Sequence, residues 1–558
     1  MTRVLNHGRF IPSFFAAVLV GSFCLDAHGA IPKKQKSNGP RVVESVAGQY
    51  LVRLSDARSL YSMKALERQL GAEIVDRVRD DVVLVQRPIA ETKTSAMKTL
   101  RSLSYVRAVE PNFIYRANRA PDDTNYKELW GLRNTGALDS KMQKGLPRID
   151  ISAEDAWEIT TGSKAVVVAV IDTGIDFSIP DLKDNAWTNS AEANGAPGVD
   201  DDGNGYVDDI HGYDFAHDDG DPIDDHSHGS HCAGTIGGRG NDGAGVVGVN
   251  WNVTLMAVKF LDENGSGNLA NAVKAVDYAR KMGAKIMSNS WGGGGKSAIL
   301  EQAIEDAKAA DVLFVAAAGN DGSDNDEFPT FPANYAVDNV LAVAAVDNRG
   351  ELAAFSNFGV TTVHVAAPGV NVLSTTPNGL KFYSGTSMAT PHVAGIAALV
   401  ASVEPMLTYS ELKAKVTSTA RKTKALEGKV ASGGLANAYS ALTGTVLTDE
   451  YDASAWADQR MYSAELPNPY PSKHDQSFTI SVAGANHVAA RFSRFKTEAH
   501  FDKVTFWNAA GEKLGEWSGE RAAGTYSPIA DGDTLVLRFT SDENVSFEGF
   551  AIDGVAVD

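Results

Sequence analysis

Six short segments between residues 165 and 369 consist almost entirely of apolar residues, many of them β-branched. They are AVVVAVID (165–172), LMAVKFL (255–261), AKIMSNS (284–290), VLFVAAAG (312–319), VLAVAAV (340–346) and VHVAAPG (363–369). Stretches with helical spacing lie between several of them, as at 268–283 and 297–310. Strands without a polar face are covered on both sides, so the pattern predicts an α/β fold with a doubly wound, mostly parallel sheet. In such sheets the active groups collect beyond the carboxyl ends of the strands.

Different patterns precede and follow this region. Residues 48–54, 82–88 and 106–117 read as strands, and 59–72 and 92–103 as amphipathic helices, which together suggest a small α+β module. After residue 445, short segments alternate apolar and polar residues with turns between them, as in SFTISVAG, HVAARFSRF and TLVLRFTSD. This alternation predicts a C-terminal β-sandwich.

The first residues have the pattern of an export signal. Arg3 and Arg9 precede an apolar run over 10–25, and small residues follow at 27, 29 and 30. The run is shorter than the roughly 20 residues that span a bilayer, so a cleaved signal is favoured over a retained anchor. We therefore expect a secreted protein, extracellular or periplasmic, with no membrane segment in its mature form. The predicted division is 1–30 signal peptide, 31–120 N-terminal module, 121–444 α/β domain and 445–558 β-sandwich.

Charge is divided unevenly along the chain. Residues 31–120 carry a net +8, whereas residues 121–558 carry −28. So acidic a body does not favour nucleic acid or anionic membranes as partners. A basic segment that precedes an acidic region can bind that region within the same chain. The alternative is that the charge difference is chance variation along a long chain. Of the two cysteines, Cys24 lies in the signal, so Cys232 is left without an intrachain partner.

Three motifs carry side chains suited to amide hydrolysis. Asp172 ends a predicted buried strand in VIDTGID, His228 lies in HSHGSHCAG, and Ser387 lies in SGTSMATPHVAG, where a turn leads into a helix. A serine hydroxyl is a poor nucleophile at neutral pH. It needs a hydrogen-bonded imidazole as base, and a buried carboxylate to orient that imidazole and offset its charge.

These segments resemble the three signature segments of the subtilase (subtilisin-like serine protease) family, in the same Asp, His, Ser order. That order differs from the Ser, Asp/Glu, His order of α/β-hydrolases. The resemblance extends over about 122–443 and implies a secreted serine endopeptidase that hydrolyses protein and peptide substrates through an acyl-enzyme. It implies Asp172, His228 and Ser387 as the catalytic triad. Among the neighbouring histidines, it implies a structural role for His231.

The resemblance also implies an oxyanion donor and a substrate-binding edge. The donor is Asn320 in VAAAGNDG, whose amide acts together with the backbone N–H of Ser387. A segment like SNSWGGG pairs with the extended substrate, and its glycines leave room for side chains. The residues expected to bind substrate are Ser290, Trp291, Gly292, Gly293, Ala317 and Gly319. Trp291 stands where the family has a smaller residue. Cys232 occupies a position where one group of subtilases also has a cysteine that is not the nucleophile.

An acidic loop at 199–214 (VDDDGNGYVDDIHGYD) resembles a calcium loop, with oxygen ligands at alternating positions and Gly205 at its sharp turn. The expected ligands are Asp200, Asp202, Asn204, the Tyr206 carbonyl, Asp208 and Asp209. His211 stands where the bidentate Glu of such loops is usual, so Asp209 or Asp214 would substitute. A solvated acidic turn is the alternative.

The flanking modules resemble known accessory domains. The basic module 31–120 resembles the subtilase propeptide, which templates folding, occupies the cleft and is cut autocatalytically, here near 117–122. The C-terminal region resembles a CUB-like sandwich without its usual cysteines, and a calcium site there would use Glu498, Asp502 and Asp542. Such modules bind proteins or glycans, but a fold alone does not fix a ligand.

Two other functions compete with a general endopeptidase. A binding protein built on an inactive protease fold is disfavoured by the complete triad and Asn320. A maturation protease of narrow specificity would need an acidic pocket for basic side chains, and the sequence does not decide this point.

Overall fold

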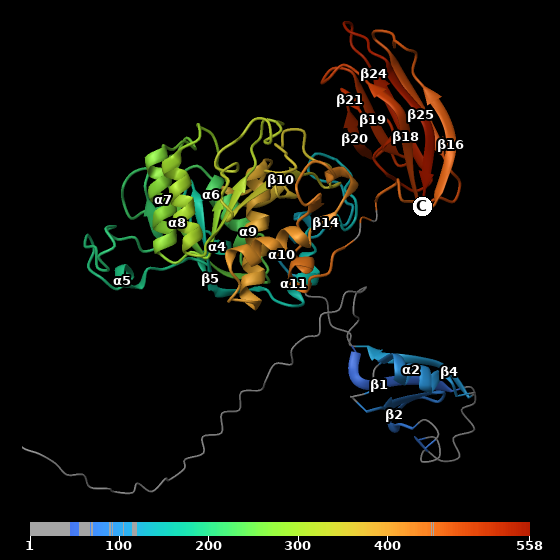
Figure 1. Ribbon diagram of the computed structural model, residues 1–558, viewed down its shortest axis with the longest axis horizontal. Helices are drawn as coiled ribbons and strands as arrows, with labels where there is room; N and C mark the ends of the chain where they lie inside the picture. Colours follow the sequence, from blue (N-terminus) through green and yellow to red (C-terminus); the bar gives the residue numbers. More distant parts are fainter. Residues whose placement is uncertain are drawn as a thin grey trace, which may run out of the picture. The chain divides into compact units, whose positions relative to one another are not determined.

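The computed structural model describes residues 45–54, 67–68, 71–88, 91, 93–103, 105–113, 120–447, 449 and 451–558. The predicted signal peptide, most of the helix expected at 59–72, and residues 117–119 of the expected processing region lie outside the described residues. Residues 45–113, 121–444 and 445–558 are called the N-terminal module, the α/β domain and the C-terminal sandwich below. Figure 1 shows the elements of each.

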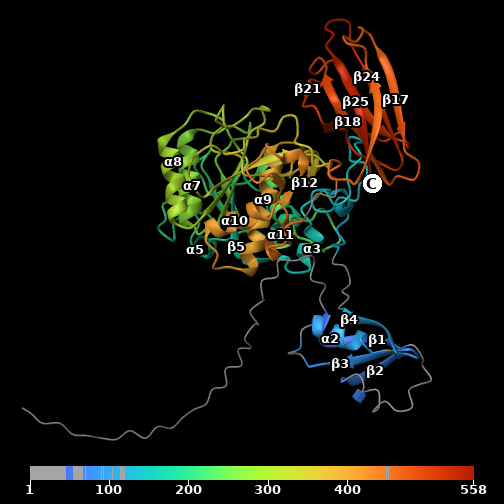
Figure 2. The same cartoon turned by 45° about the vertical axis from the view of Figure 1, so that its right-hand side comes forward.

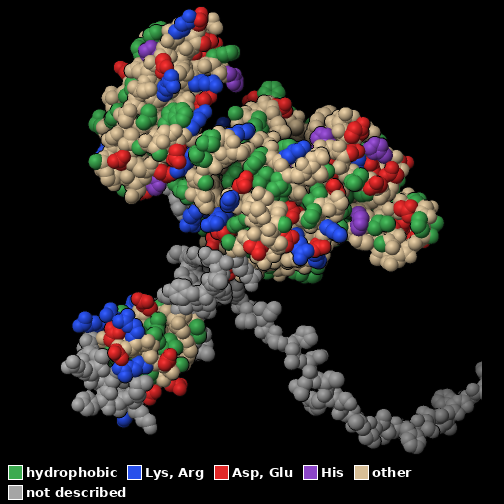
Figure 3. All heavy atoms as spheres, turned by 180° about the vertical axis from the view of Figure 1, so that it is seen from behind, with side chains coloured by type: hydrophobic (Ala, Val, Ile, Leu, Met, Phe, Trp, Pro, Cys, Tyr) green, Lys and Arg blue, Asp and Glu red, His purple; other side chains and the backbone are tan. Residues whose placement is uncertain are grey.

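The N-terminal module contains a four-stranded antiparallel sheet in the order β2-β3-β1-β4. Its elements are β1 (Ser45–Leu54), β2 (Glu73–Arg79), β3 (Val82–Gln86), α2 (Lys93–Arg101) and β4 (Val106–Phe113). Alternate apolar residues of β1 and β3, such as Val52 and Val85, pack with Leu100 of α2 in a small core. Lysine and arginine side chains gather on part of its surface (Figure 3).

The α/β domain is built on a nine-stranded sheet in the order β14-β15-β11-β10-β9-β8-β5-β7-β6. Every pairing in it is parallel except that of β14 with β15. The strands are β5 (Gly162–Asp172), β6 (Gly212–Asp214), β7 (Asn252–Lys259), β8 (Ile286–Asn289), β9 (Leu313–Ala317), β10 (Val340–Val346), β11 (Val365–Pro368), β14 (Arg421–Lys422) and β15 (Gly434–Leu435). The predicted doubly wound sheet is thus confirmed.

Helices cover both faces of this sheet. Val168 and Val170 of β5 pack in the cluster that contains α6 (His228–Gly237) and α9 (Thr386–Val403). Ala169 and Ile171 point the other way, into the cluster of α7 (Leu269–Lys281) and α8 (Ala298–Ala309). Figure 2 shows α7 and α8 side by side. Both sides of a strand are therefore buried, which explains its continuous apolar sequence.

Shorter elements complete this domain. They are η2 (Tyr126–Glu128), α3 (Ala153–Trp157), α4 (Pro180–Lys183), α5 (Ser190–Ala193), the hairpin β12 (Val372–Thr376) and β13 (Gly379–Tyr383), α10 (Tyr409–Ser418), η3 (Lys424–Leu426) and α11 (Ala438–Thr443). In the described part of the chain, α9 is the one helix long and apolar enough to cross a membrane, but 83% of that window is buried inside the protein. We therefore interpret α9 as a core helix.

The C-terminal sandwich consists of two antiparallel sheets. One contains β16 (Asp458–Glu465), β25 (Gly549–Val557), β18 (His487–Lys496), β21 (Glu520–Arg521), β22 (Thr525–Tyr526) and β23 (Ala530–Asp531). The other contains β17 (Asp475–Ser481), β24 (Thr534–Thr540), β19 (Lys503–Asn508) and β20 (Lys513–Trp517). Aromatic side chains pack between them: Phe506 makes edge-to-face contacts with Phe492 and Trp517, and the Phe492 and Trp517 rings are tilted against each other. The predicted sandwich is confirmed, with aromatic packing in a core that has no cysteine.

Candidate active site

Asp172 and His228 meet where strand β5 ends. Asp172 is the last residue of β5 and is fully buried, and His228 is the first residue of α6. The Nδ1 atom of His228 lies 2.7 Å from Oδ1 of Asp172. A carboxylate accepts the proton of Nδ1, which leaves the lone pair of Nε2 free to act as a base.

The start of α6 is fixed by hydrogen bonds that reach back to β5. Asp224 is buried, and its Oδ1 accepts from Thr173 Oγ1, which in turn accepts from the N–H of Gly229. A Cβ on Gly229 would lie 2.1 Å from the Gly174 carbonyl oxygen, so only glycine allows this close approach. Sequence reasoning missed Asp224, although it lies only four residues before His228.

Ser387 is the second residue of α9, and its hydroxyl donates to the Ser290 carbonyl oxygen at 3.1 Å. No hydrogen bond joins Ser387 to His228 among the described residues. The two residues nevertheless flank the same thiol: Cys232 Sγ lies 3.5 Å from the Ser387 carbonyl oxygen and 4.0 Å from His228 Nδ1. Catalytic hydrogen bonds often tighten only when substrate binds, so this geometry fits a resting nucleophile.

The electrostatics of the site favour a charged imidazole. Burial acts to lower the pKa of His228, but the neighbouring Asp172 carboxylate outweighs it, and the pKa is raised well above its ordinary value. Burial raises the pKa of the Cys232 thiol. A buried, protonated thiol does not serve as the nucleophile.

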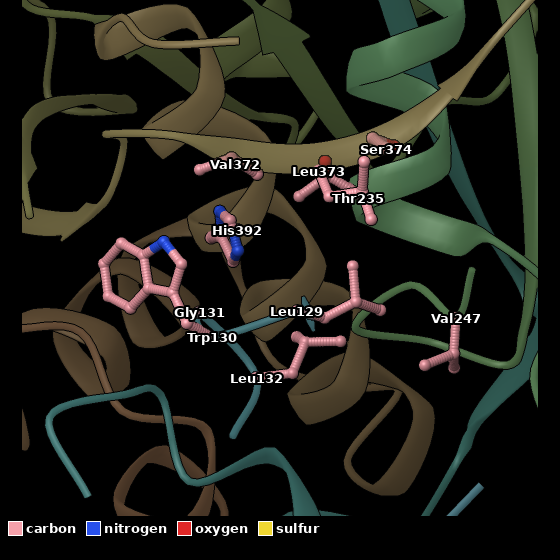
Figure 4. A pocket seen from close by; sticks show the side chains of 10 residues that line it. All are labelled: Leu129, Trp130, Gly131, Leu132, Thr235, Val247, Val372, Leu373, Ser374 and His392. Atoms are coloured by element: carbon pink, nitrogen blue, oxygen red, sulfur yellow. The ribbon is translucent and has the colours of Figure 1, made fainter. Parts of the chain in front are cut away.

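The other histidines near the motifs have different surroundings. His231 is buried, contacts the carbonyl oxygens of Val372 and Lys381, and burial lowers its pKa to about 3. His392 contacts the Met388 carbonyl oxygen, and burial lowers its pKa to about 4. His392 lines the narrow pocket of Figure 4, which is separate from the triad. Both rings are therefore neutral at physiological pH.

Two hydrogen-bond donors converge beside Ser387. The Asn320 side chain accepts from the backbone N–H of Thr386 through Oδ1 at 2.8 Å, so its Nδ2 is left to donate. A Cβ on Gly385 would lie 3.6 Å from both Asn320 Nδ2 and the Ser387 nitrogen. The first N–H groups of a helix have no partner inside it, so Ser387 N–H can also donate. Together they form a pocket suited to an oxyanion.

Comparison with known proteins decides the family. Residues 163–441 match the model of the subtilase family, and residues 452–553 match that of the CUB domain. The chain is 35% identical over 404 residues to a thermophilic serine proteinase of Bacillus sp. strain AK1, which covers 71% of this chain and 88% of the relative. The chain belongs to the subtilase family.

Other relatives cover less of this subtilase. It is 36% identical over 293 residues to thermitase of Thermoactinomyces vulgaris, covering 52% of this chain and 93% of thermitase. It is 36% identical over 314 residues to subtilisin-like protease 1 of Plasmodium berghei, covering 52% of each chain. The chain is thus a subtilisin-like serine endopeptidase with a C-terminal CUB domain.

The predicted substrate-binding residues lie at the ends of two neighbouring strands. Ser290, Trp291, Gly292 and Gly293 follow β8, and Ala317 and Gly319 lie at the end of β9. A Cβ on Gly319 would lie 3.2 Å from the Thr330 methyl carbon, and one on Gly292 would lie 3.8 Å from it. The methyl group of Thr330, which sequence reasoning missed, therefore faces both glycines. The Trp291 ring packs instead against Phe260, with centroids 4.9 Å apart.

The acidic loop of the subtilase brings three carboxylates together. Ligand atoms of Glu192, Asp202 and Asp209 lie within 4.8 Å of one another. Asn189 and Asn204 donate to the buried Asp209, as does Tyr278. Glu192 comes from α5, before the loop, and sequence reasoning missed it.

The remaining predicted ligands of this loop have other contacts. Asp200 accepts from the backbone N–H groups of residues 203–205, and Asp208 accepts from that of Gly198. The Tyr206 ring packs in an aromatic cluster with Tyr213. His211 contacts the Trp187 carbonyl oxygen. These contacts close the turn around the three carboxylates.

Two further buried carboxylates lie near the start of the α/β domain. Asp123 and Asp181 are both buried, and each accepts one backbone N–H from the segment 241–246. Oδ1 of Asp123 is buried without a hydrogen-bond partner in the part of the chain described. Burial raises the pKa of both carboxyl groups, that of Asp181 to about 6, and Asp242 adds repulsion. Such a pair fits a bound cation, because buried charges need compensation.

In the CUB domain the three predicted ligands lie together. Ligand atoms of Glu498, Asp502 and Asp542 lie within 4.8 Å of one another. Asp502 is fully buried and accepts from Tyr470 and from the Asp542 backbone N–H. Burial raises the pKa of Glu498, as do its two acidic neighbours. The donors are all oxygen atoms, which is the set that calcium prefers.

Proposed function

We propose that this subtilase is a secreted endopeptidase, made as an autoprocessed zymogen, with Asp172, His228 and Ser387 as its triad. The observation that carries the proposal is the 2.7 Å contact between His228 and the buried Asp172, next to Ser387 at the start of α9. Cys232 also lies beside His228, but burial raises the pKa of its thiol, so Ser387 is the better candidate for the nucleophile.

Catalysis begins when the Ser387 hydroxyl turns from the Ser290 carbonyl to His228 Nε2. His228 takes the proton while Oγ forms a bond to the substrate carbonyl carbon, and the negative charge moves to the carbonyl oxygen. Asn320 Nδ2 and the Ser387 N–H stabilise that charge. His228 then gives its proton to the leaving amine as the C–N bond breaks. Water hydrolyses the acyl-enzyme by the same steps.

Substrate binds in an extended conformation along residues 290–293, with one side chain between Gly292 and Gly319. A Cβ on Gly319 would lie 3.2 Å from the Thr330 methyl carbon and 2.4 Å from the Asn357 amide nitrogen, so both side chains border the proposed pocket. We infer that this pocket prefers small and medium apolar substrate side chains. The glycines alone would suggest a preference for large apolar side chains.

Calcium is proposed as a structural ion. The group Glu192, Asp202 and Asp209 and the pair Asp123 and Asp181 would hold it in the subtilase domain, and Glu498, Asp502 and Asp542 would hold it in the CUB domain. The orphaned Oδ1 of the buried Asp123 supports the fit. A bound cation offsets the repulsion among these carboxylates and so stabilises the fold.

The N-terminal module is proposed as the propeptide, and residues 1–30 as the export signal. The net +8 charge of 31–120 against the acidic remainder supports an inhibitory complex with the enzyme's own cleft. The CUB domain is a protein-binding module, and we propose that it recruits protein or glycan partners.

Ser387→Ala tests the proposal. The full-length variant should accumulate as unprocessed precursor and should hydrolyse casein at least 10³-fold more slowly, since loss of a triad member leaves only residual catalysis. Ser384→Ala, which removes a hydroxyl three residues earlier, should mature and digest casein normally. A Ser387→Ala chain that matures and digests like the parent would show that the triad assignment is wrong.

A further inference from the structure

One histidine and two carboxylates meet at the surface of the subtilase domain, outside the triad and the calcium groups. They are His217, which follows β6, Asp225, which precedes the catalytic motif, and Glu263, which follows β7. Their ligand atoms all lie within 4.8 Å of one another. The three side chains are 48%, 36% and 57% exposed, so an ion can reach them from solvent.

The ring of His217 is oriented by a fourth residue. Asp214, whose side chain is 3% exposed, lies 2.8 Å from His217 Nδ1 through Oδ2. Nδ1 therefore carries the proton of the neutral ring, and the lone pair is on Nε2. Nε2 faces Glu263, with 3.9 Å between Nε2 and Oε2. Histidines that bind metals are oriented in this way, with the other ring N–H donated to a carboxylate.

The charges around the cluster are unbalanced. Asp214, Asp225 and Glu263 contribute three carboxylates, and the cation that pairs with them is Lys259, whose Nζ lies 2.8 Å from Oδ1 of Asp225. Two negative charges remain when the imidazole is in its neutral form, which is the form that binds a metal ion. A divalent cation offsets them.

We propose that His217, Asp225 and Glu263 bind a zinc ion, with water as its fourth ligand. A set of one imidazole and two carboxylates suits zinc, whereas calcium takes oxygen donors. Tetrahedral zinc with bonds of about 2 Å holds its ligand atoms about 3.3 Å apart. Exposed side chains close from 4.8 Å to that separation by small rotations.

The site is linked to the active site through Lys259. The Lys259 ammonium is buried and donates to the carbonyl oxygens of Thr173 and Leu261 as well as to Asp225. Thr173 follows the catalytic Asp172. Zinc would therefore order Asp225 and the start of α6, which carries His228, against the end of β5.

Metal binding is measured on the full-length Ser387→Ala chain, which prevents self-digestion, with calcium in excess to occupy oxygen sites. Binding of Co²⁺ is followed by its visible absorption, and binding of Zn²⁺ is followed by calorimetry. We expect one equivalent of Zn²⁺ and a Co²⁺ spectrum of nitrogen and oxygen ligation. His217→Ala should weaken binding at least 10-fold, and Asp214→Asn about 10–100-fold, as outer partners of metal-bound histidines do.

His226→Ala is the matched control, since it removes an exposed histidine of the same loop, and it should bind zinc like the parent. The unfolding midpoints of His217→Ala and the parent are also compared without metal. Equal midpoints show that the variant is folded. Unchanged affinity in His217→Ala overturns the proposal. A spectrum with thiolate character that is lost in Cys232→Ser places the ion at the triad and also overturns it. So does zinc binding that excess calcium abolishes.

Discussion

The Asp172 carboxylate directs its charge to a single imidazole. Its Oδ1 contacts His228 Nδ1 and the Thr173 N–H, and its Oδ2 is buried without a hydrogen-bond partner in the described part of the chain. A buried charge with few other partners interacts strongly with the one cation that it can reach. This explains why the pKa of His228 is raised although burial opposes the charged ring.

Asp172→Asn should change both the rate and its pH dependence. The active form of His228 is the neutral base, so kcat/KM of the parent falls as pH drops through the raised pKa. Without the carboxylate that pKa falls, and the acidic limb of the profile should move to lower pH. The rate at the plateau should fall about 10⁴-fold, because the ring loses its orienting partner. A pH profile of peptide hydrolysis measures both effects; an acidic limb that stays in place would contradict this account of the pKa.

We propose that Thr330 limits the size of the primary pocket. Thr330→Gly removes the methyl group that faces Gly292 and Gly319. The ratio of kcat/KM for substrates with Phe over those with Ala in the pocket should rise about 10–200-fold, since a methylene in a hydrophobic pocket contributes that much. Thr330→Val keeps the shape and loses only the contact of Oγ1 with Asn357, so its ratio should match the parent. Peptide-library cleavage gives the ratio. If Thr330→Gly and Thr330→Val give the same ratio, Thr330 does not line the pocket.

At the scale of elements, the position of α6 depends on direct backbone contact. Gly229 lies against the Gly174 carbonyl oxygen, while Thr173 and Asp224 join the two segments by hydrogen bonds. The helix therefore sets the distance between His228 and the end of β5. A change of about 1 Å at such a point is enough to lower the rate strongly.

Gly229→Ala should separate α6 from β5. Its Cβ would lie 2.1 Å from a backbone oxygen, so the segments must move apart, at a cost of about 1–3 kcal/mol of unfolding free energy. Casein hydrolysis should fall at least 10²-fold. Gly295→Ala, at a glycine with open space around it, should keep the unfolding midpoint of the parent. Calorimetry in the Ser387→Ala background gives the midpoints. A Gly229→Ala enzyme of normal rate would mean that this contact does not position the imidazole.

At the scale of the whole molecule, the sequence was sufficient to predict the structure where burial or a motif determines it. β10 occupies 340–346 as predicted because both of its faces are buried, and two of the three motifs bring Asp172 and His228 into contact. Sites assembled from distant segments were harder to predict. Asp123 and Asp181 lie 58 positions apart, and Thr330 faces Gly292 from another loop. Neither the spacing nor the residue type of such groups distinguishes them from ordinary surface residues.

Calcium removal tests whether these distant carboxylates act together. A ligand that binds only the folded state stabilises it by about 2.7 kcal/mol at one hundred times its Kd. Chelation should therefore lower the unfolding midpoint of the full-length Ser387→Ala chain, and added calcium should restore it. Asp181→Asn should reduce the response, because the buried pair loses one of its two charges. Asp338→Asn, which changes an exposed carboxylate (83% exposed), should respond like the parent. The proposal fails if the midpoints with and without the chelator are equal and elemental analysis finds no calcium. The buried carboxylates Asp123 and Asp181 would then hold no cation.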